Sequence, residues 1–345
     1  MNGNPFGKPL APCPIMDYKS AGVNIEAGEA LVDSIKPFVK ATRTPGVLSE
    51  IGLFGGFYDA RFPELDHPVL VASADGVGTK LKVAIMAGVH HTVGQCLVNH
   101  CVNDILACGA RPLFFLDYFA TGRLESGVAR DVIKGMAAAC IENECALLGG
   151  ETAEMPSIYS DGDYDVAGTI VGVVDKSKIL NGSRVNIGDV LIGLPSTGLH
   201  TNGYSLARAA LFPAYSVDQY VESLGATIGD ALLAVHRSYV NVVSPLLKAD
   251  LINGLSHITG GGIVGNTSRI LREGLDLDIS WGSWDMPPIF DLIQHAGDIT
   301  REEMRHVFNL GVGMILVVNP NNVDAVLNQL AAERPFVVGS IVAST

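Results

Sequence analysis

Residues 113–151 read LFFLDYFATGRLESGVARDVIKGMAAACIENECALLGGE, and this stretch carries the signal that decides the fold. Seven of its first eight residues are apolar or aromatic, the exception being Asp117, which is typical of a buried strand. Residues 126–145 carry apolar side chains at helical spacing, and residues 146–151 form a second apolar run that ends in two glycines and Glu151. The stretch predicts strand, helix and strand, with a carboxylate at the end of the second strand.

The same mixture of helical and strand patterns continues on both sides of this stretch. Asn24 is expected to cap the first helix, and the polar run DKSKILNGSR at 175–184 is the best candidate for a domain boundary. We therefore predict an α+β protein of two domains, with a flexible arm at 1–16, an N-terminal domain at 17–175 and a C-terminal α/β domain at 176–345. The other expected helices cover 25–43, 92–108, 204–211, 229–248, 263–272 and 322–332, and the other expected strands cover 69–74, 165–174, 190–194, 314–318 and 336–342.

Composition narrows the function classes. The chain has 345 residues, 48% of them hydrophobic, and its net charge is −13, so it can bury sizeable cores and would repel nucleic acid and anionic lipid. Neither a secretion signal nor an apolar run long enough to cross a bilayer is recognisable, and the six cysteines form no C-x-x-C pair. We expect a cytoplasmic protein with no nucleic-acid or membrane partner, whose cysteines are buried apolar groups.

The run DGVGTKL at 75–81 combines a carboxylate, two glycines, a hydroxyl and an ammonium within a few residues. Magnesium needs only one or two protein carboxylates together with substrate phosphates, so this inventory suits a magnesium–phosphate site. Asp75 and Glu151 are expected at strand ends and Asp104 on a helix, from where the three carboxylates could converge. Taken alone, an Asp-Gly turn is most often only a turn.

The glycines of GGGIVG at 260–265 fit two nucleotide-binding patterns in spacing but not in context. A dinucleotide fingerprint needs an apolar strand before it, which residues 255–259 do not supply, and a phosphate loop needs a lysine where Asn266 stands. What remains is either a phosphate site made by backbone N–H groups at a helix start or only a tight turn. His200 and His257 lie in loops rich in glycine and hydroxyl groups and are candidate functional residues, whereas His90, His91, His236, His295 and His306 are expected to be structural.

Taken in order, the motifs resemble the aminoimidazole ribonucleotide synthetase family, also called phosphoribosylformylglycinamidine cyclo-ligase. The resemblance extends from Asp17 to the C-terminus, apart from SEIGLFGGFYDARF at 49–62. GGETAEMP and FNLGVGM are specific to this family, whereas DGVGTK is shared with a wider ATP-using superfamily. The matching motifs are SADGVGTKL at 73–81, GGETAEMP at 149–156, STGLHTNGYSL at 196–206, HITGGG at 257–262 and FNLGVGM at 308–314.

The resemblance implies an N-terminal sheet that dimerises into a barrel, a C-terminal α/β domain beside it, and ATP with Mg²⁺ in the cleft. It implies the ATP-dependent closure of an imidazole ring on formylglycinamidine ribonucleotide, with release of ADP and phosphate, in de novo purine biosynthesis by a homodimer. By the same resemblance, the catalytic residues are Lys19, Lys80 and His257, and the metal ligands are Asp75, Asp104 and Glu151. The implied ATP and phosphate contacts are Asp75, Gly76, Gly78, Thr79, Lys80, Asn103, Asp104, Gly149, Gly150, Glu151 and Thr152, and the implied substrate contacts are Ser196, Thr197, His200, Asn202, Gly260, Gly261 and Gly262.

Two alternatives stay open from the sequence. A sister kinase or synthetase of the same superfamily would keep DGVGTK but has no reason to keep GGETAEMP and HTNGYSL. A catalytically inactive binding protein would be expected to have lost one of the three acidic residues, and all three are present.

Overall fold

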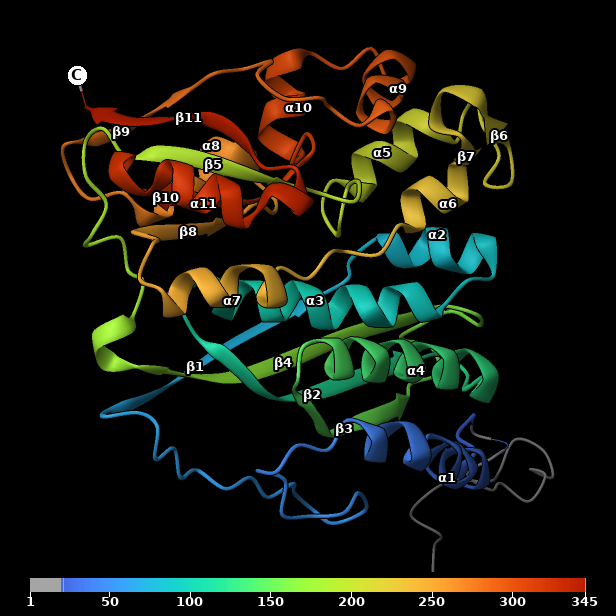
Figure 1. Ribbon diagram of the computed structural model, residues 1–345. Helices are drawn as coiled ribbons and strands as arrows, with labels where there is room; N and C mark the ends of the chain where they lie inside the picture. The colour runs from blue at the N-terminus through green and yellow to red at the C-terminus, as the bar shows by residue number, and fades with distance from the viewer. Residues whose placement is uncertain (1–19, 21, 345) are drawn as a thin grey trace, which may run out of the picture.

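The computed structural model describes residue 20 and residues 22–344, which form two sheets with helices between and around them (Figure 1). The first sheet has the strand order β1-β4-β2-β3, in which β2 and β3 are parallel and the other pairs antiparallel. Its strands are β1 (Pro68–Gly76), β2 (Arg111–Thr121), β3 (Ala146–Glu154) and β4 (Tyr164–Asp175).

The second sheet has the order β8-β10-β5-β11-β9, and all of its neighbouring strands are antiparallel. Strand β10 lies near the middle of this sheet and is buried along its whole length, as its unbroken apolar sequence predicts. The strands are β5 (Val190–Pro195), β8 (Gly254–His257), β9 (Leu275–Ile279), β10 (Val312–Val318) and β11 (Phe336–Ala343), and β6 (Tyr220–Val221) and β7 (Ala226–Thr227) form a small separate ribbon.

Helix α3 (His91–Ala107) lies between the two sheets and packs against both (Figure 1). It contacts β1 and β4 on one side and β8 on the other, while α4 (Ser126–Glu142) covers the rest of the first sheet. Most of its residues are buried, including the polar side chains of Asn99, His100 and Asn103, so α3 has no solvent-exposed face of the kind that a surface helix would have. The remaining helices are α1 (Ile25–Ala41), α2 (Lys80–Ala87), α5 (Tyr204–Leu211), α6 (Ile228–Leu233), α7 (Val240–Lys248), α8 (Gly262–Thr267), α9 (Pro288–Ala296), α10 (Arg301–Val307) and α11 (Val323–Gln329).

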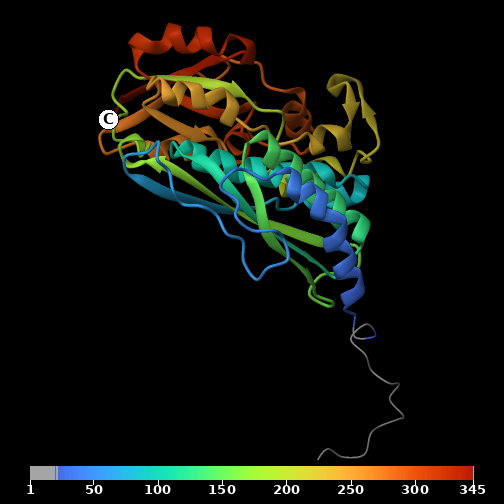
Figure 2. The same cartoon turned by 60° about the horizontal axis from the view of Figure 1, so that its bottom comes forward.

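The other face of the first sheet is not covered by helices. Leu70, Leu116 and Tyr118 lie exposed on it, and the segment between α1 and β1 runs beside it on the side away from the second sheet (Figure 2). Together with the edge of β3 and with α1, this segment lines a groove of about 1310 Å³. An apolar sheet face of this kind is a surface for further packing.

Several expected elements agree with the structure and two do not. Asn24 caps α1, its side chain accepting from the N–H of Ala27. The helix expected at 229–248 is instead two helices, α6 and α7, joined by an extended segment at 234–239. The helix expected at 263–272 ends early, because α8 stops at Thr267 and a short 3-10 turn follows.

The break between α6 and α7 has a physical cause. Buried side chains of α3 bind the backbone of the 234–239 segment: Asn99 donates to the carbonyl of His236 at 2.8 Å, and Asn103 donates to that of Arg237 at 2.8 Å. The N–H of Tyr239 in turn donates to the side-chain oxygen of Asn103. These side chains replace the hydrogen bonds that a continuous helix would have supplied.

Candidate functional site

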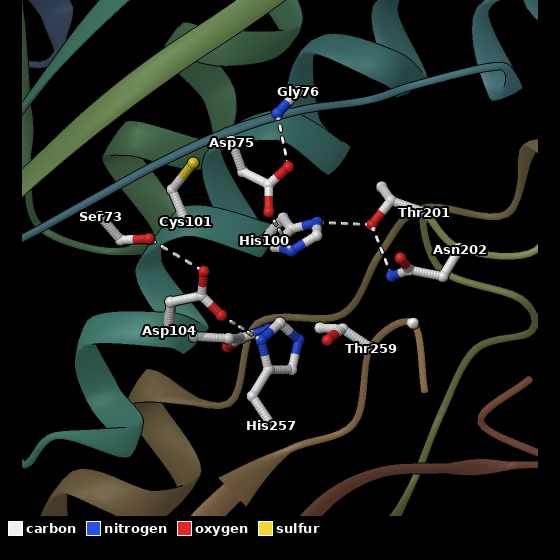
Figure 3. Close-up of polar contacts among 12 residues, drawn as sticks. Ser73, Asp75, Gly76, His100, Cys101, Asp104, Thr201, Asn202, His257 and Thr259 are labelled. Carbon is white, nitrogen blue, oxygen red and sulfur yellow. Dashed lines mark hydrogen bonds and ion pairs between the residues drawn. The ribbon is translucent and has the colours of Figure 1, made fainter. Parts of the chain in front are cut away.

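A cluster of carboxylates and imidazoles lies where the two halves of the chain meet (Figure 3). Asp75 comes from the end of β1, and His100 and Asp104 come from α3. The second half contributes Thr201, from the loop after β5, and His257, the last residue of β8. The cluster is thus assembled from segments more than 150 residues apart in sequence, as the 153-residue separation of Asp104 and His257 shows.

Five polar contacts join these side chains into one chain from Asp75 to Asp104. The first part runs from Asp75 Oδ2 to His100 Nε2 (3.0 Å) and from His100 Nδ1 to Thr201 Oγ1 (2.6 Å). Thr201 Oγ1 then lies 3.3 Å from His236 Nδ1, and the Nε2 atoms of His236 and His257 lie 3.0 Å apart. The last contact joins His257 Nδ1 to Asp104 Oδ1 at 2.7 Å, and Ser73 donates to the other oxygen of Asp104 at 2.9 Å.

Burial controls the charge of this cluster. It lowers the pKa of His257, and it lowers the pKa values of His200 and His236 well below their ordinary value, so these rings are neutral near pH 7. Burial by itself would raise the pKa values of Asp75 and Asp104. The neighbouring imidazoles of His100 and His257 lower these pKa values by more, so both carboxyl pKa values lie below their ordinary value. The site therefore combines ionised carboxylates with the neutral, buried rings of His200, His236 and His257.

His200 is placed behind this cluster. Its ring stacks on that of His236 at a centroid distance of 4.0 Å, and its Nε2 accepts from the N–H of Thr197 at 3.2 Å. The other ring nitrogen, Nδ1, is buried and has no hydrogen-bond partner among the described residues. His200 thus supports the loop of the second half and the ring of His236.

The other predicted substrate residues lie in the loops next to the cluster. Ser196 donates to the carbonyl of Gly198 and to Asn309, and so it fixes its own turn. Asn202 lies against Gly260: a Cβ atom at Gly260 would come within 3.2 Å of the Asn202 side-chain oxygen. The structure therefore brings the HTNG loop and the ITGGG turn side by side, as a shared substrate site would require.

Lys80 is placed differently from the expected phosphate contact. Its ammonium is fully buried and donates to the carbonyls of His200 (2.9 Å) and Ala234 (2.7 Å), with the thiol of Cys96 at 3.2 Å. Three acceptor atoms thus surround it, and burial lowers its pKa. We conclude that Lys80 joins α2 to the second half of the chain, which corrects its expected role at a phosphate.

Glu151 does not converge with Asp75 and Asp104 in the described chain. Asp75 on β1 and Gly150 on β3 lie in the same row of the sheet, connected through Gly168 on β4 and Asp117 on β2. The two outer strands are therefore three strand spacings apart, or about 14 Å. Glu151 pairs with Tyr118, which lies on the uncovered face, whereas Asp75 faces α3. Gly149, Gly150, Glu151 and Thr152 instead line the groove beside β3.

The remaining predicted residues lie as follows. Gly78 and Thr79 are exposed in the turn between β1 and α2, where Thr79 contacts Ser205 at 3.0 Å, and Gly76 donates its N–H to the carboxylate of Asp75. Asn103 binds the 234–239 segment rather than facing solvent. Lys19 lies outside the described residues, and its role at a phosphate stays a prediction.

The sequence reasoning missed His100, Thr201 and Ser73, and it treated His236 as only structural. His100 stands within the apolar repeat of a buried helix, and His236 stands in a segment that was expected to be helical. A signal was nevertheless present at His100, because an ionisable side chain four residues before Asp104 lies on the same helix face as that carboxylate.

The predicted magnesium can be tested against the donor atoms that are present. Asp75 and Asp104 offer carboxylate oxygens, which fit a divalent cation, and each has an imidazole nitrogen within 3.0 Å. The ligand atoms that lie within 4.8 Å of one another here are those of Asp104, His100 and His257; Asp75 lies beside His100, and Glu151 stands apart from the site.

Comparison with known proteins identifies both halves of the chain. Residues 59–174 match the N-terminal domain of AIR synthase related proteins, and residues 186–345 match the C-terminal domain. The phosphoribosylformylglycinamidine cyclo-ligase of Thermoanaerobacter sp. (strain X514) is 49% identical over 333 residues, which cover 95% of this chain and 98% of the relative. The protein of the same name from Geobacter metallireducens is 50% identical over 328 residues, which cover 94% of each.

Solved structures show the same fold at much lower identity. A thiamine-monophosphate kinase from Stenotrophomonas maltophilia aligns with a TM-score of 0.69 at 17% identity, covering 90% of this chain and 94% of that one. The hydrogenase maturation protein HypE of E. coli aligns with a TM-score of 0.64 at 15% identity, covering 92% of each. These two likenesses establish the fold, and the nearly full-length relatives at about half identity establish more: the chain belongs to the phosphoribosylformylglycinamidine cyclo-ligase family of AIR synthase related proteins.

Proposed function

We propose that this protein closes the imidazole ring of aminoimidazole ribonucleotide from formylglycinamidine ribonucleotide, with conversion of ATP to ADP and phosphate, as a step of purine biosynthesis. The observation that carries the proposal is the identity of 49–50% to cyclo-ligases along nearly the whole of both chains. No helix in the described part of the chain is long and apolar enough to span a membrane. A cytoplasmic location belongs to the same proposal, supported by the free thiols of all five described cysteines.

The reaction needs side chains that position the substrates and neutralise the charge of the phosphoryl group, and it does not need a covalent nucleophile. A formamide oxygen is a poor leaving group, so ATP first transfers its terminal phosphoryl group to that oxygen. The amidine nitrogen of the substrate then attacks the formyl carbon, the C–O bond breaks, and phosphate leaves with the former formyl oxygen. Such a reaction needs groups that hold phosphates, orient the nitrogen and accept its proton.

The cluster at the junction supplies these groups. Asp75 and Asp104 would hold Mg²⁺, which when bound neutralises the charge on the transferring phosphoryl group. The exposed turn at Gly78 and Thr79 brings backbone N–H groups close to the same place. His257 is the predicted catalytic imidazole, and its neutral ring, held between His236 and Asp104, is suited to accept a proton during ring closure.

The predicted ATP contacts at Gly149–Thr152 lie along the groove beside β3 rather than in this cluster. We keep these four residues as proposed ATP contacts. The proposal also includes a homodimer, formed through the uncovered face of the first sheet. The exposed side chains of Leu70, Leu116 and Tyr118 support such a dimer, because a second copy would bury them.

Product analysis tests the proposed reaction directly. The purified protein is incubated with ATP, Mg²⁺ and formylglycinamidine ribonucleotide carrying oxygen-18 in its formyl group. We expect ADP, phosphate and aminoimidazole ribonucleotide in equal amounts by mass spectrometry, with the heavy oxygen in the phosphate. A stable phosphorylated substrate without an imidazole would instead indicate a kinase and would refute the cyclo-ligase.

A further inference from the structure

The second carboxylate of the GGETAEMP motif makes contacts that the proposed function does not use. Glu154 is the last residue of β3, and its pairing with Thr121 of β2 fixes its backbone. Its side-chain Oε2 accepts from the backbone N–H of Asn24 at 2.7 Å, and its Oε1 accepts from that of Leu124 at 2.7 Å. Hydrogen bonds from backbone N–H groups to a carboxylate are strong ones. Glu154 therefore fastens two other segments to the end of β3.

These two segments are the start of α1 and the loop before α4. Asn24 is the N-cap of α1, and Leu124 lies in the loop between β2 and α4. A further contact adds to the first attachment, because Gly22 packs on Pro156: a Cβ atom at Gly22 would come within 3.0 Å of the Pro156 ring. The chain that leads into α1 is thus held at the end of β3.

The first part of α1 depends on this attachment. The buried side chains of α1 are Leu31, Ile35 and Val39, and none of residues 25–30 is buried. Gly28 also lies in this part, and a glycine inside a helix lowers its stability. Helix ends fray readily where no contact outside the helix holds them. The contacts at the end of β3 therefore fix the position of the first turns of α1.

The same part of α1 forms one wall of the groove beside β3. Ile25, Gly28 and Glu29 line the groove from α1, and residues 149–152 line it from β3. The two elements are in contact and lie next to each other in Figure 1. Glu154 itself is not among the residues that line the groove. The width of the groove at this end therefore depends on where Glu154 holds the start of α1.

We propose that Glu154 is a positioning residue, which holds the first turns of α1 against the groove and so sets the affinity of the groove for ATP. It acts through α1 and not by contact with the ligand, because it lies outside the groove lining. The inference deepens the proposed function and rests on it for the identity of the ligand and for the ATP contacts at Gly149–Thr152.

ATP binding is measured on the purified full chain by isothermal titration calorimetry, with Mg²⁺ and without the ribonucleotide, so that no turnover is needed. Glu154→Gln keeps the size of the side chain, but its amide nitrogen cannot accept, so one of the two hydrogen bonds is lost. We expect the dissociation constant of ATP to rise about tenfold. Amide hydrogen exchange at residues 24–30 should become faster, while the circular dichroism stays that of the parent.

Two controls show where the effect arises. Glu273→Gln is the matched variant, because Glu273 is exposed and its side chain has no partner in the described part of the chain; it should bind ATP as the parent does. The affinity of Glu154→Gln for formylglycinamidine ribonucleotide should stay within about twofold of the parent value, because the predicted substrate residues lie at the junction and not beside α1. If Glu154→Gln does not fold, Glu154→Asp, whose carboxylate is set back by one methylene group, is measured with the same expected loss.

Two results would overturn the proposal. One is an unchanged affinity for ATP in Glu154→Gln, and the other is a weakened affinity with unchanged hydrogen exchange at the start of α1. Thr152→Val, at a proposed ATP contact in the groove, separates this failure from a failure of the proposed function. If Thr152→Val weakens ATP binding and Glu154→Gln does not, only the positioning role is wrong. If neither variant weakens it, the proposed ATP contacts are wrong as well.

Discussion

Asp75 is the most exposed carboxylate of the cluster, and its geometry leads to a direct prediction. It accepts from His100 and from the N–H of Gly76, so an asparagine can keep its place in the turn while losing the charge. Asp75→Asn should lower turnover about 10²-fold, which is the size of effect seen when one electrostatic stabiliser is removed. Steady-state kinetics with saturating ATP and Mg²⁺ measure it, and near-normal turnover would contradict the assignment.

Asp117 leads to a second prediction, which concerns pH. Its carboxyl lies on β2 against the backbone of Gly150, where a Cβ atom would come within 2.1 Å of it, and burial raises its pKa from 3.8 to about 7. Because the folded pKa is above the unfolded one, this group favours the folded state at low pH and loses that contribution as the pH rises from about 4 to about 7.

Asp117→Asn should therefore raise the melting temperature more at pH 8 than at pH 5. Thermal unfolding followed by circular dichroism at both pH values measures the difference. Asp33→Asn, on the exposed side of α1, is the control and should change little at either pH. An equal change in melting temperature at the two pH values would contradict a raised pKa for Asp117.

Single residues also show what the sequence could and could not predict. The sequence was sufficient to select Asp75, Asp104 and His257 as candidates, because their side chains can do chemistry and glycines lie near them. The position of Lys80 was not predictable, because its acceptors are carbonyls at His200 and Ala234, more than 100 residues away along the chain. A local sequence pattern does not indicate contacts between residues so far apart along the chain.

At the scale of elements, the segment at 234–239 explains the largest error of the sequence analysis. Apolar side chains continue at helical spacing on both sides of it, so periodicity predicts one helix over 229–248. The structure favours an extended segment because Asn99, Asn103 and Lys80 bind its carbonyls from the first half of the chain. Most strands were predicted well, since their apolar runs are short and end at glycines or polar residues.

A prediction at this scale concerns Asn99 on α3. Its side chain donates to the carbonyl of His236 and accepts from Asn143, and it is 1% exposed. Asn99→Leu should lower the free energy of unfolding by about 1–3 kcal/mol, because two buried polar groups lose their partner.

Urea unfolding of the full chain measures the effect of Asn99→Leu. The matched control is Asn241→Ala on α7, where an exposed asparagine donates to a carbonyl of α4. This control should change the free energy of unfolding by less than about 0.5 kcal/mol. If both variants behave alike, the α3 side chains do not hold the 234–239 segment in place.

At the scale of the whole molecule, the prediction concerns assembly. The chain has a mass of 36.3 kDa, and the apolar side chains on the uncovered face of its first sheet would be buried by a second copy. We expect a dimer of about twice this mass by light scattering at micromolar concentration.

Tyr118→Lys should shift this assembly toward the monomer, because a lysine on the sheet face resists burial in an apolar interface. Ile187→Lys, at an exposed site in the second half, is the control and should leave the mass unchanged. A parent protein of 36.3 kDa at micromolar concentration would exclude the dimer.

The position of α3 between the two sheets has a consequence for synthesis on the ribosome. The helix ends at Ala107, but β8, which covers its other side, ends at His257, about 150 residues later. At a translation rate of about 5–20 residues per second, that interval lasts about 8–30 s. During this time one side of a helix that is buried along most of its length has no cover, so the nascent chain should be a client for chaperones until β8 has emerged.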